Sequence, residues 1–182
     1  MNKARNYLLL FCITLLLSFT CSDDPKPINN LIKYDGTQIE ISSAIVYFKE
    51  RQIRPSLVAY YYNFLFYDDQ FTLKPDNKLV GIGDAFVFSI YSDKQEFPVG
   101  NFLLNSASEN LEDEYVFDPV IFYSYNTETN IPEKQIAYFE QSKVSITKED
   151  DVFTIEFRAI KDNKELRVSF KGRILVSQVT LY

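Results

Sequence analysis

Hydrophobic and polar residues alternate with a period of two along the C-terminal part of the chain. Residues 153–159 (FTIEFRA) are apolar at odd positions, and residues 166–171 (LRVSFK) are apolar at even positions. Successive side chains of a strand point to opposite faces, so both runs predict strands with one buried and one solvated face. The polar tetrad 161–164 between them is typical of a tight turn, which predicts an antiparallel hairpin.

Further strands flank this hairpin. Residues 144–146 indicate an earlier strand that joins it through the acidic stretch 148–151. After Gly172, residues 174–176 begin a last strand whose parity then slips, so we expect a bulge near Ser177. The stretch 144–182 is therefore predicted to be a four-stranded meander.

The strands upstream are more apolar. Residues 57–67 (LVAYYYNFLFY), 85–91 (AFVFSIY) and 120–125 (VIFYSY) are apolar on both parities. Such runs are typical of central strands that are covered on two sides. No segment shows the apolar stripe of a helix.

The complete pattern predicts an all-β fold with roughly eight to ten strands in one domain. Residues 39–41 and 45–48 form a shorter opening pair, and Pro, Gly, Asn and Asp interrupt the strands at 74–77, 97–100 and 105–114. We expect residues 36–182 to form a single antiparallel β-sandwich or barrel, with a lipocalin-like barrel as the alternative.

The N-terminus has the pattern of an export signal. Residues 1–6 carry two cations and no acid, and residues 7–20 form an apolar run that is too short for a comfortable membrane span. Residues 1–20 are therefore predicted to be a secretory signal peptide. Removal of this segment, with Cys12 in it, leaves Cys21 as a lone thiol.

Cys21 is followed by Ser22, Asp23, Asp24 and a spacer with two prolines. This arrangement resembles a bacterial lipoprotein signal, although Thr20 stands where a smaller residue is usual. The Cys-Ser-Asp-Asp motif also resembles surface lipoproteins of the Bacteroidetes group. The resemblance implies acylation of Cys21, an export signal in the three residues after it, and an outer-membrane protein exposed at the cell surface. Residues 21–35 would form the acylated N-terminus and a flexible tether.

Two short segments add to this resemblance. Residues 97–102 (FPVGNF) and 169–174 (SFKGRI) are similar to segments of single-domain Bacteroidetes lipoproteins of unknown function. The resemblance implies a β-rich domain outside the cytoplasm and no assigned reaction.

Charge and composition exclude several function classes. The chain has a net charge of −6, and loss of Lys3 and Arg5 with the signal leaves 17 cations against 25 acids, or −8. An acidic domain repels phosphate backbones, so we expect no nucleic-acid partner. With no histidine in the chain, His-dependent triads and imidazole metal sites are impossible. We expect a protein that is not an enzyme and has no metal or cofactor.

Acidic side chains gather in two places. Glu109 and residues 112–114 lie in a predicted loop, and residues 149–151 lie at a predicted hairpin tip. Oxygen ligands at short spacing can hold Ca²⁺, but neither cluster has the regular spacing of a calcium loop. We expect solvated acidic loops. Paired carboxylates can also hydrolyse glycosides, although chance neighbours are certain among 25 acids.

The aromatic run at residues 60–67 offers the one candidate binding surface. The chain has 13 Tyr and 16 Phe but no Trp. In a strand, Tyr60, Tyr62 and Phe64 share one face, where they could bind a ligand. Core packing and cross-strand aromatic pairing explain the same residues, and this alternative stays open.

These observations favour a binding module for a glycan, a small apolar ligand or an envelope protein. The alternative is a structural or assembly subunit of an outer-membrane complex, with no small-molecule ligand. Such a subunit would offer an exposed edge strand, for example at residues 179–182, for β-augmentation.

Overall fold

The computed structural model describes residues 30–54, 57–92, 94–103 and 115–178, and it contains strands but no helix in these ranges. The all-β prediction is confirmed. The strands are β1 (Leu31–Tyr34), β2 (Thr37–Glu40), β3 (Ser43–Arg54), β4 (Leu57–Tyr67), β5 (Phe71–Leu73), β6 (Leu79–Ser92), β7 (Gly100–Leu103), β8 (Tyr115–Asn126), β9 (Lys134–Ile136), β10 (Gln141–Glu149), β11 (Val152–Lys161), β12 (Lys164–Gly172) and β13 (Leu175–Gln178).

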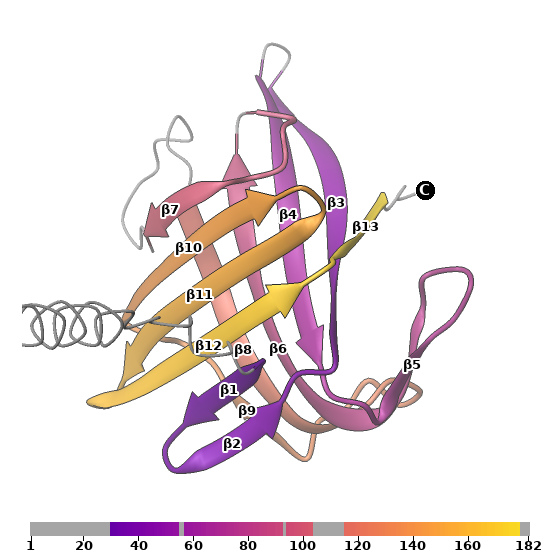
Figure 1. Cartoon of the computed structure of the whole chain (residues 1–182), viewed down its shortest axis with the longest axis vertical. Coiled ribbons are helices and arrows are strands. Elements are labelled where there is room, and N and C mark those ends of the chain that lie inside the picture. Colours follow the sequence, from indigo (N-terminus) through magenta and orange to yellow (C-terminus); the bar gives the residue numbers. More distant parts are fainter. Residues whose placement is uncertain (1–29, 55–56, 93, 104–114, 179–182) are drawn as a thin grey trace, which may run out of the picture.

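The strands form two sheets that pack face to face as a sandwich (Figure 1). The smaller sheet has the order β2-β1-β12-β11-β10-β7, and the larger sheet has the order β13-β3-β4-β6-β8-β9, with β5 paired to β6. In Figure 1 the strands of the smaller sheet run across the strands of the larger one. The sandwich is thus confirmed and the barrel alternative is wrong, because two separate sheets with free edges do not close.

Aromatic side chains fill the space between the sheets. Phe64 of β4 stacks on Phe88 of β6 with ring centroids 4.6 Å apart, and Phe88 reaches Phe157 of β11 at 5.1 Å. All three rings are fully buried. A large aromatic side chain buries about 150–250 Å², so much of the high Phe content serves to hold the two sheets together.

The predicted C-terminal hairpin is confirmed. β11 and β12 pair antiparallel from Phe153↔Gly172 to Lys161↔Lys164, which leaves Asp162 and Asn163 as a two-residue turn. Both turn residues have positive φ, as in the turns that match the right-handed twist of a hairpin. β10 pairs with the other side of β11 in regular register, so three strands of the predicted meander are present.

The fourth strand of that meander is not where the pattern placed it. β13 leaves the smaller sheet and pairs in parallel with β3 at the edge of the larger sheet. The reason is competition for an edge, because β1 already occupies the free side of β12, with Leu31 opposite Ser169. The β13–β3 register is regular across Ser177, so the described strand lacks the expected bulge.

The sandwich begins earlier than the expected boundary at residue 36. β1 lies within the range 21–35 that was predicted to be a tether, and Leu31, Ile32 and Tyr34 are buried. The strands also number thirteen in the described ranges, against an expected eight to ten. The excess consists of strands of three or four residues, which are too short to show a period in the sequence.

The three apolar runs lie where expected. β4 lies between β3 and β6, β6 between β4 and β8, and β8 between β6 and β9. The remaining question is what covers their second face, because only one face of each strand can meet the smaller sheet.

Candidate functional site: a groove on the outer face of the larger sheet

The outer face of the larger sheet carries its own apolar cluster. Ile45, Tyr67, Phe71 and Ala85 are buried together on this side, away from the core between the sheets. The hairpin formed by β5 and β6 folds over part of this face, since Phe71 contacts Tyr67 edge to face with ring centroids 6.1 Å apart. This cover explains why β4 and β6 are apolar on both parities.

The hairpin leaves a groove of about 490 Å³ beside it. The floor is made by half-buried apolar side chains of three neighbouring strands, namely Leu65, Val87 and Phe122. The register places Leu65 opposite Val87, so the floor is continuous across β4 and β6. The full lining is Tyr47, Leu65, Asp76, Asn77, Lys78, Leu79, Ala85, Val87, Phe122, Tyr125 and Thr127.

Two tyrosines form part of the walls of the groove. The Tyr47 hydroxyl donates to the backbone oxygen of Asn77 at 3.0 Å. Burial raises the pKa of Tyr47, and the nearby Tyr67 raises that pKa further, so the ring stays neutral. The Tyr125 hydroxyl donates to Asn130, and its ring packs at 5.3 Å from Phe122.

The polar side chains of the groove are largely bonded within the protein. Asn77 Nδ2 donates to Ser177 Oγ at 3.1 Å, which joins the β5–β6 connection to β13. Thr127 Oγ1 donates to the Gly81 oxygen and accepts from the Gly81 nitrogen. Only Asp76 and Lys78 add exposed charge, at the rim. The groove is therefore built for apolar contact, and its lining contains no pair of groups suited to nucleophilic catalysis.

The candidate residues Tyr60, Tyr62 and Phe64 lie elsewhere. They share the inner face of β4, as expected, and that face meets the core. Tyr62 and Phe64 are 2% and 1% exposed, and the Tyr62 hydroxyl donates to the backbone oxygens of Gln95 and Glu96. The core alternative therefore describes both residues, whose burial leaves no surface for a ligand. Tyr60 is half-buried and stacks on Phe48 at 5.9 Å.

The groove residues were missed because the candidate binding residues occupy the even-numbered positions of the aromatic run, whereas the groove uses an odd-numbered one. Leu65 belongs to the same run, one residue from Phe64, and faces the other way. The available signal was the apolar character of both parities in residues 57–67 and 85–91. It predicts a covered second face, but it does not predict that the cover is incomplete.

The acidic groups form no metal site in the described residues. Residues 149–151 lie exposed at the β10–β11 turn, as expected, and residues 109 and 112–114 lie outside the described ranges. A hollow near Glu40 also contains Asp68 and Asp84. Their carboxylates accept backbone N–H groups, from Asp84 to Asp68 Oδ2 and from Ser124 to Asp84 Oδ1, each at 2.8 Å. These carboxylates therefore stabilise the backbone of the sheet through hydrogen bonds.

The predicted lipidation site Cys21 and the export residues Ser22, Asp23 and Asp24 lie outside the described residues. Within the residues that the structure does describe, no helix has the length and apolar character needed to cross a membrane.

No protein-family model, curated protein or solved structure matches this chain. The groove and the N-terminal pattern are therefore the features from which its function is inferred.

Proposed function

We propose that this protein is a membrane-anchored lipoprotein of the cell envelope whose β-sandwich binds a small apolar ligand in the outer groove. The observation that carries the proposal is the half-buried apolar floor of Leu65, Val87 and Phe122, which the folded-over hairpin leaves partly uncovered. The groove volume of about 490 Å³ falls in the usual range for ligand pockets, about 300–1,000 Å³. Each 100 Å² of apolar surface that a ligand covers contributes about 2.5 kcal/mol before the entropy cost of binding.

The groove suits an apolar ligand better than a glycan. Sugar hydroxyls need protein donors and acceptors that are still available, and those of Asn77, Thr127 and Tyr47 already bond within the fold. An apolar ligand needs no such partners. The exposed charges of Asp76 and Lys78 at the rim would face a polar end group of the ligand, which would remain in water.

The anchor places the groove close to a source of apolar molecules. Leu31, the first strand residue, follows Cys21 by ten residues, so the linker spans at most about 35 Å. With Cys21 acylated, the sandwich stays near the membrane surface, where apolar molecules partition.

Titration with the neutral dye N-phenyl-1-naphthylamine tests the groove. The non-acylated chain 21–182 with Cys21→Ser should bind one dye molecule saturably, with a blue-shifted emission. Val87→Lys, which puts an ammonium group on the groove floor, should weaken binding at least tenfold. The matched control is Val99→Lys, because Val99 is exposed and outside the groove, and it should bind as the parent does.

Two results would reject the groove as a ligand site. One is the absence of saturable binding, and the other is equal affinity of the Val87→Lys and Val99→Lys variants. Urea unfolding of both variants separates a lost site from a lost fold, and Leu79→Lys on the groove wall provides a second variant if Val87→Lys does not fold.

The assembly-subunit alternative has one observation in its favour. β13 is an edge strand, and its Leu175 and Val176 side chains are 42% and 48% exposed. An edge strand with apolar side chains is suited to pairing with a strand of another protein. Crosslinking in the native envelope tests this alternative: a partner captured by the parent chain and lost in Val176→Lys, but kept in Val99→Lys, would favour it.

A further inference from the structure

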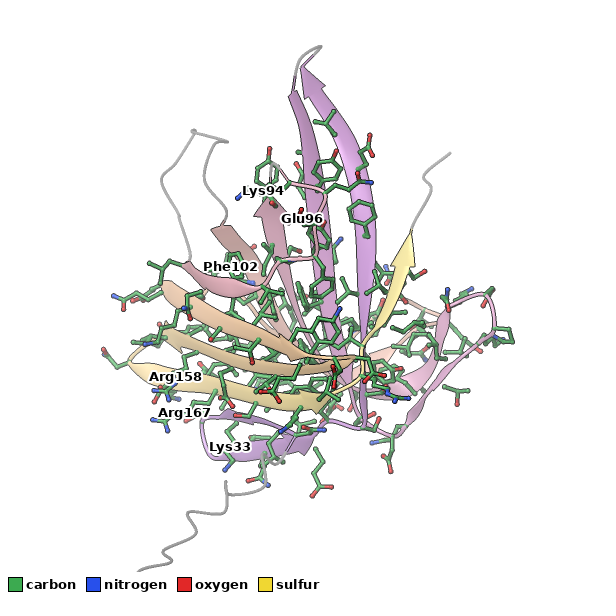
Figure 2. The ribbon with its side chains drawn as sticks, turned by 45° about the horizontal axis from the view of Figure 1, so that its top comes forward. Lys33, Lys94, Glu96, Phe102, Arg158 and Arg167 are labelled. Carbon is green, nitrogen blue, oxygen red and sulfur yellow. The ribbon has the colours of Figure 1, made fainter. Side chains whose placement is uncertain are left out.

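Four cations lie in one line across the outer face of the smaller sheet. The register sets Lys143 of β10 opposite Arg158 of β11, Arg158 opposite Arg167 of β12, and Arg167 opposite Lys33 of β1. All four side chains are exposed. Figure 2 shows Arg158, Arg167 and Lys33 following one another along one side of the ribbon. We call these four residues the basic row.

The basic row is costly for the sheet. Neighbouring strands lie about 4.8 Å apart, and like charges directly opposite each other are unfavourable. The alternating pattern requires polar residues at these positions, but it does not require cations. The chain as a whole has 25 acids against 19 cations, so four aligned cations are also at odds with its composition.

Acids within the described part of the chain neutralise one member of the row, Arg167, and leave the other three unpaired. Glu165 pairs with Arg167 at 2.6 Å, and both side chains are exposed. The hydrogen bond from Arg167, with the charges of Arg167, Arg158 and Lys143, holds the pKa of Glu165 below its usual value. In the described part of the chain, Lys33, Lys143 and Arg158 have no ion-pair partner.

The surroundings of the row define the shape of a suitable partner. On the same face, Glu156 lies two residues from Arg158 along β11 and accepts a hydrogen bond from Ser169. Glu165 lies two residues from Arg167 along β12, on the opposite side of the row. These acids repel a broad anionic surface such as a membrane, but they leave a narrow positive line of about 14 Å. Hollows of about 280 Å³ beside Lys143 and Arg158, and about 350 Å³ beside Lys33 and Arg167, flank this line.

The spacing of the row favours a polysaccharide over an extended peptide. A peptide strand presents side chains on one face at intervals of about 6.7 Å, which does not match strands about 4.8 Å apart. A chain of acidic sugars carries one carboxylate per ring, and one ring is comparable in length to the distance between strands. Because successive rings turn about the chain axis, the match is between the charge density of the chain and that of the row, not between single pairs of groups. Arginine binds carboxylates through two parallel hydrogen bonds, which suits Arg158 and Arg167 at the centre of the row.

We propose that the basic row binds a single extended segment of an acidic, carboxylate-bearing polysaccharide. This site lies on the opposite outer face of the sandwich from the apolar groove and does not depend on it. The protein would thus hold an anionic glycan chain on one face and a small apolar ligand on the other.

Calorimetric titration of the full chain, purified in a neutral detergent, tests the proposal with polygalacturonate oligomers and with neutral dextran. The parent should bind polygalacturonate and not dextran. The double variant Arg158→Gln/Arg167→Gln should lose at least tenfold in affinity. The matched control is Lys74→Gln/Arg173→Gln, which makes the same change in net charge away from the row and should change affinity less than twofold.

Several outcomes would overturn the proposal. They are no binding of polygalacturonate by the parent, equal losses in the two double variants, or equally strong binding to polyglutamate or to anionic lipid vesicles. Polyglutamate binding would assign the row to an acidic peptide, and vesicle binding would assign it to a membrane. Because all four substituted side chains are exposed, each variant should fold, and urea unfolding checks this. Loss of the like-charge repulsion should leave the Arg158→Gln/Arg167→Gln variant at least as stable as the parent.

Discussion

At the scale of single residues, Gly83 is fixed by the carboxylate beside it. A Cβ atom at this position would lie 2.4 Å from Asp68 Oδ1 and 2.9 Å from the ring of Phe71. The Asp68 carboxylate has little freedom to move, because it accepts hydrogen bonds from the Gln70 and Asp84 nitrogens at 3.0 and 2.8 Å. This close approach of Gly83 and Asp68 lies next to a register shift between β6 and β8. It therefore helps to fix the path of β6, which contributes Val87 to the groove floor.

We expect Gly83→Ala to lower the free energy of unfolding by about 1–3 kcal/mol, the usual cost of overpacking a tight site. Urea unfolding measures this loss. In an Asp68→Ala background the added methyl group meets less obstruction, so the same change should cost clearly less. Equal costs in both backgrounds would show that the Asp68 carboxylate does not constrain Gly83.

At the scale of elements, the β11–β12 hairpin depends on a turn that few residues adopt well. Asp162 and Asn163 have φ values of 51° and 60°, in the left-handed region that favours Gly and tolerates Asn or Asp. The Asn side chain thus makes the turn possible, and a glycine would adopt the same conformation with less strain. A β-branched residue would be strained in this left-handed conformation.

Asn163→Gly should therefore raise the free energy of unfolding by about 0.5 kcal/mol, and Asn163→Val should lower it by about 1–2 kcal/mol. The same pair of substitutions at Asn101, an exposed residue within β7, provides the control. There Val should be at least as stable as Gly, because a strand favours β-branched residues. If the Gly variant is more stable than the Val variant at both sites, the left-handed turn is not the cause of the difference at Asn163.

The elements also show what sequence patterns can and cannot predict. The pairing of β10, β11 and β12 was predicted because these strands follow one another in the chain and a turn joins each strand to the next. β13 was misplaced because its partner depends on β1, a strand of four residues more than 130 positions upstream. Periodicity predicts which face of a strand is buried, but it cannot predict which sheet edge is still free.

The same limit applies to the candidate sites. Residues 60, 62 and 64 were correctly placed on one face, but an aromatic face looks the same whether a sheet or a ligand covers it. The basic row could not be seen in the sequence, because its four cations come from four strands and only the register aligns them.

At the scale of the whole molecule, the sandwich presents two outer faces of opposite character. The larger sheet offers the apolar groove, and the smaller sheet offers the basic row. A short linker from Cys21 to β1 would hold both faces near a membrane, since β1 enters the smaller sheet at Leu31. Tethering a small domain in this way raises the local concentration of any ligand that the membrane or the cell surface holds.

The anchor is the premise that connects these faces to a membrane, and intact mass tests it most directly. The protein should be extracted with detergent from native membranes and compared with a Cys21→Ala form. We predict a mature chain that begins at Cys21 and carries acyl mass, and a Cys21→Ala chain without that mass. A parent chain cut elsewhere and free of acyl groups would contradict the account, and the sandwich would then act as a secreted domain without a tether.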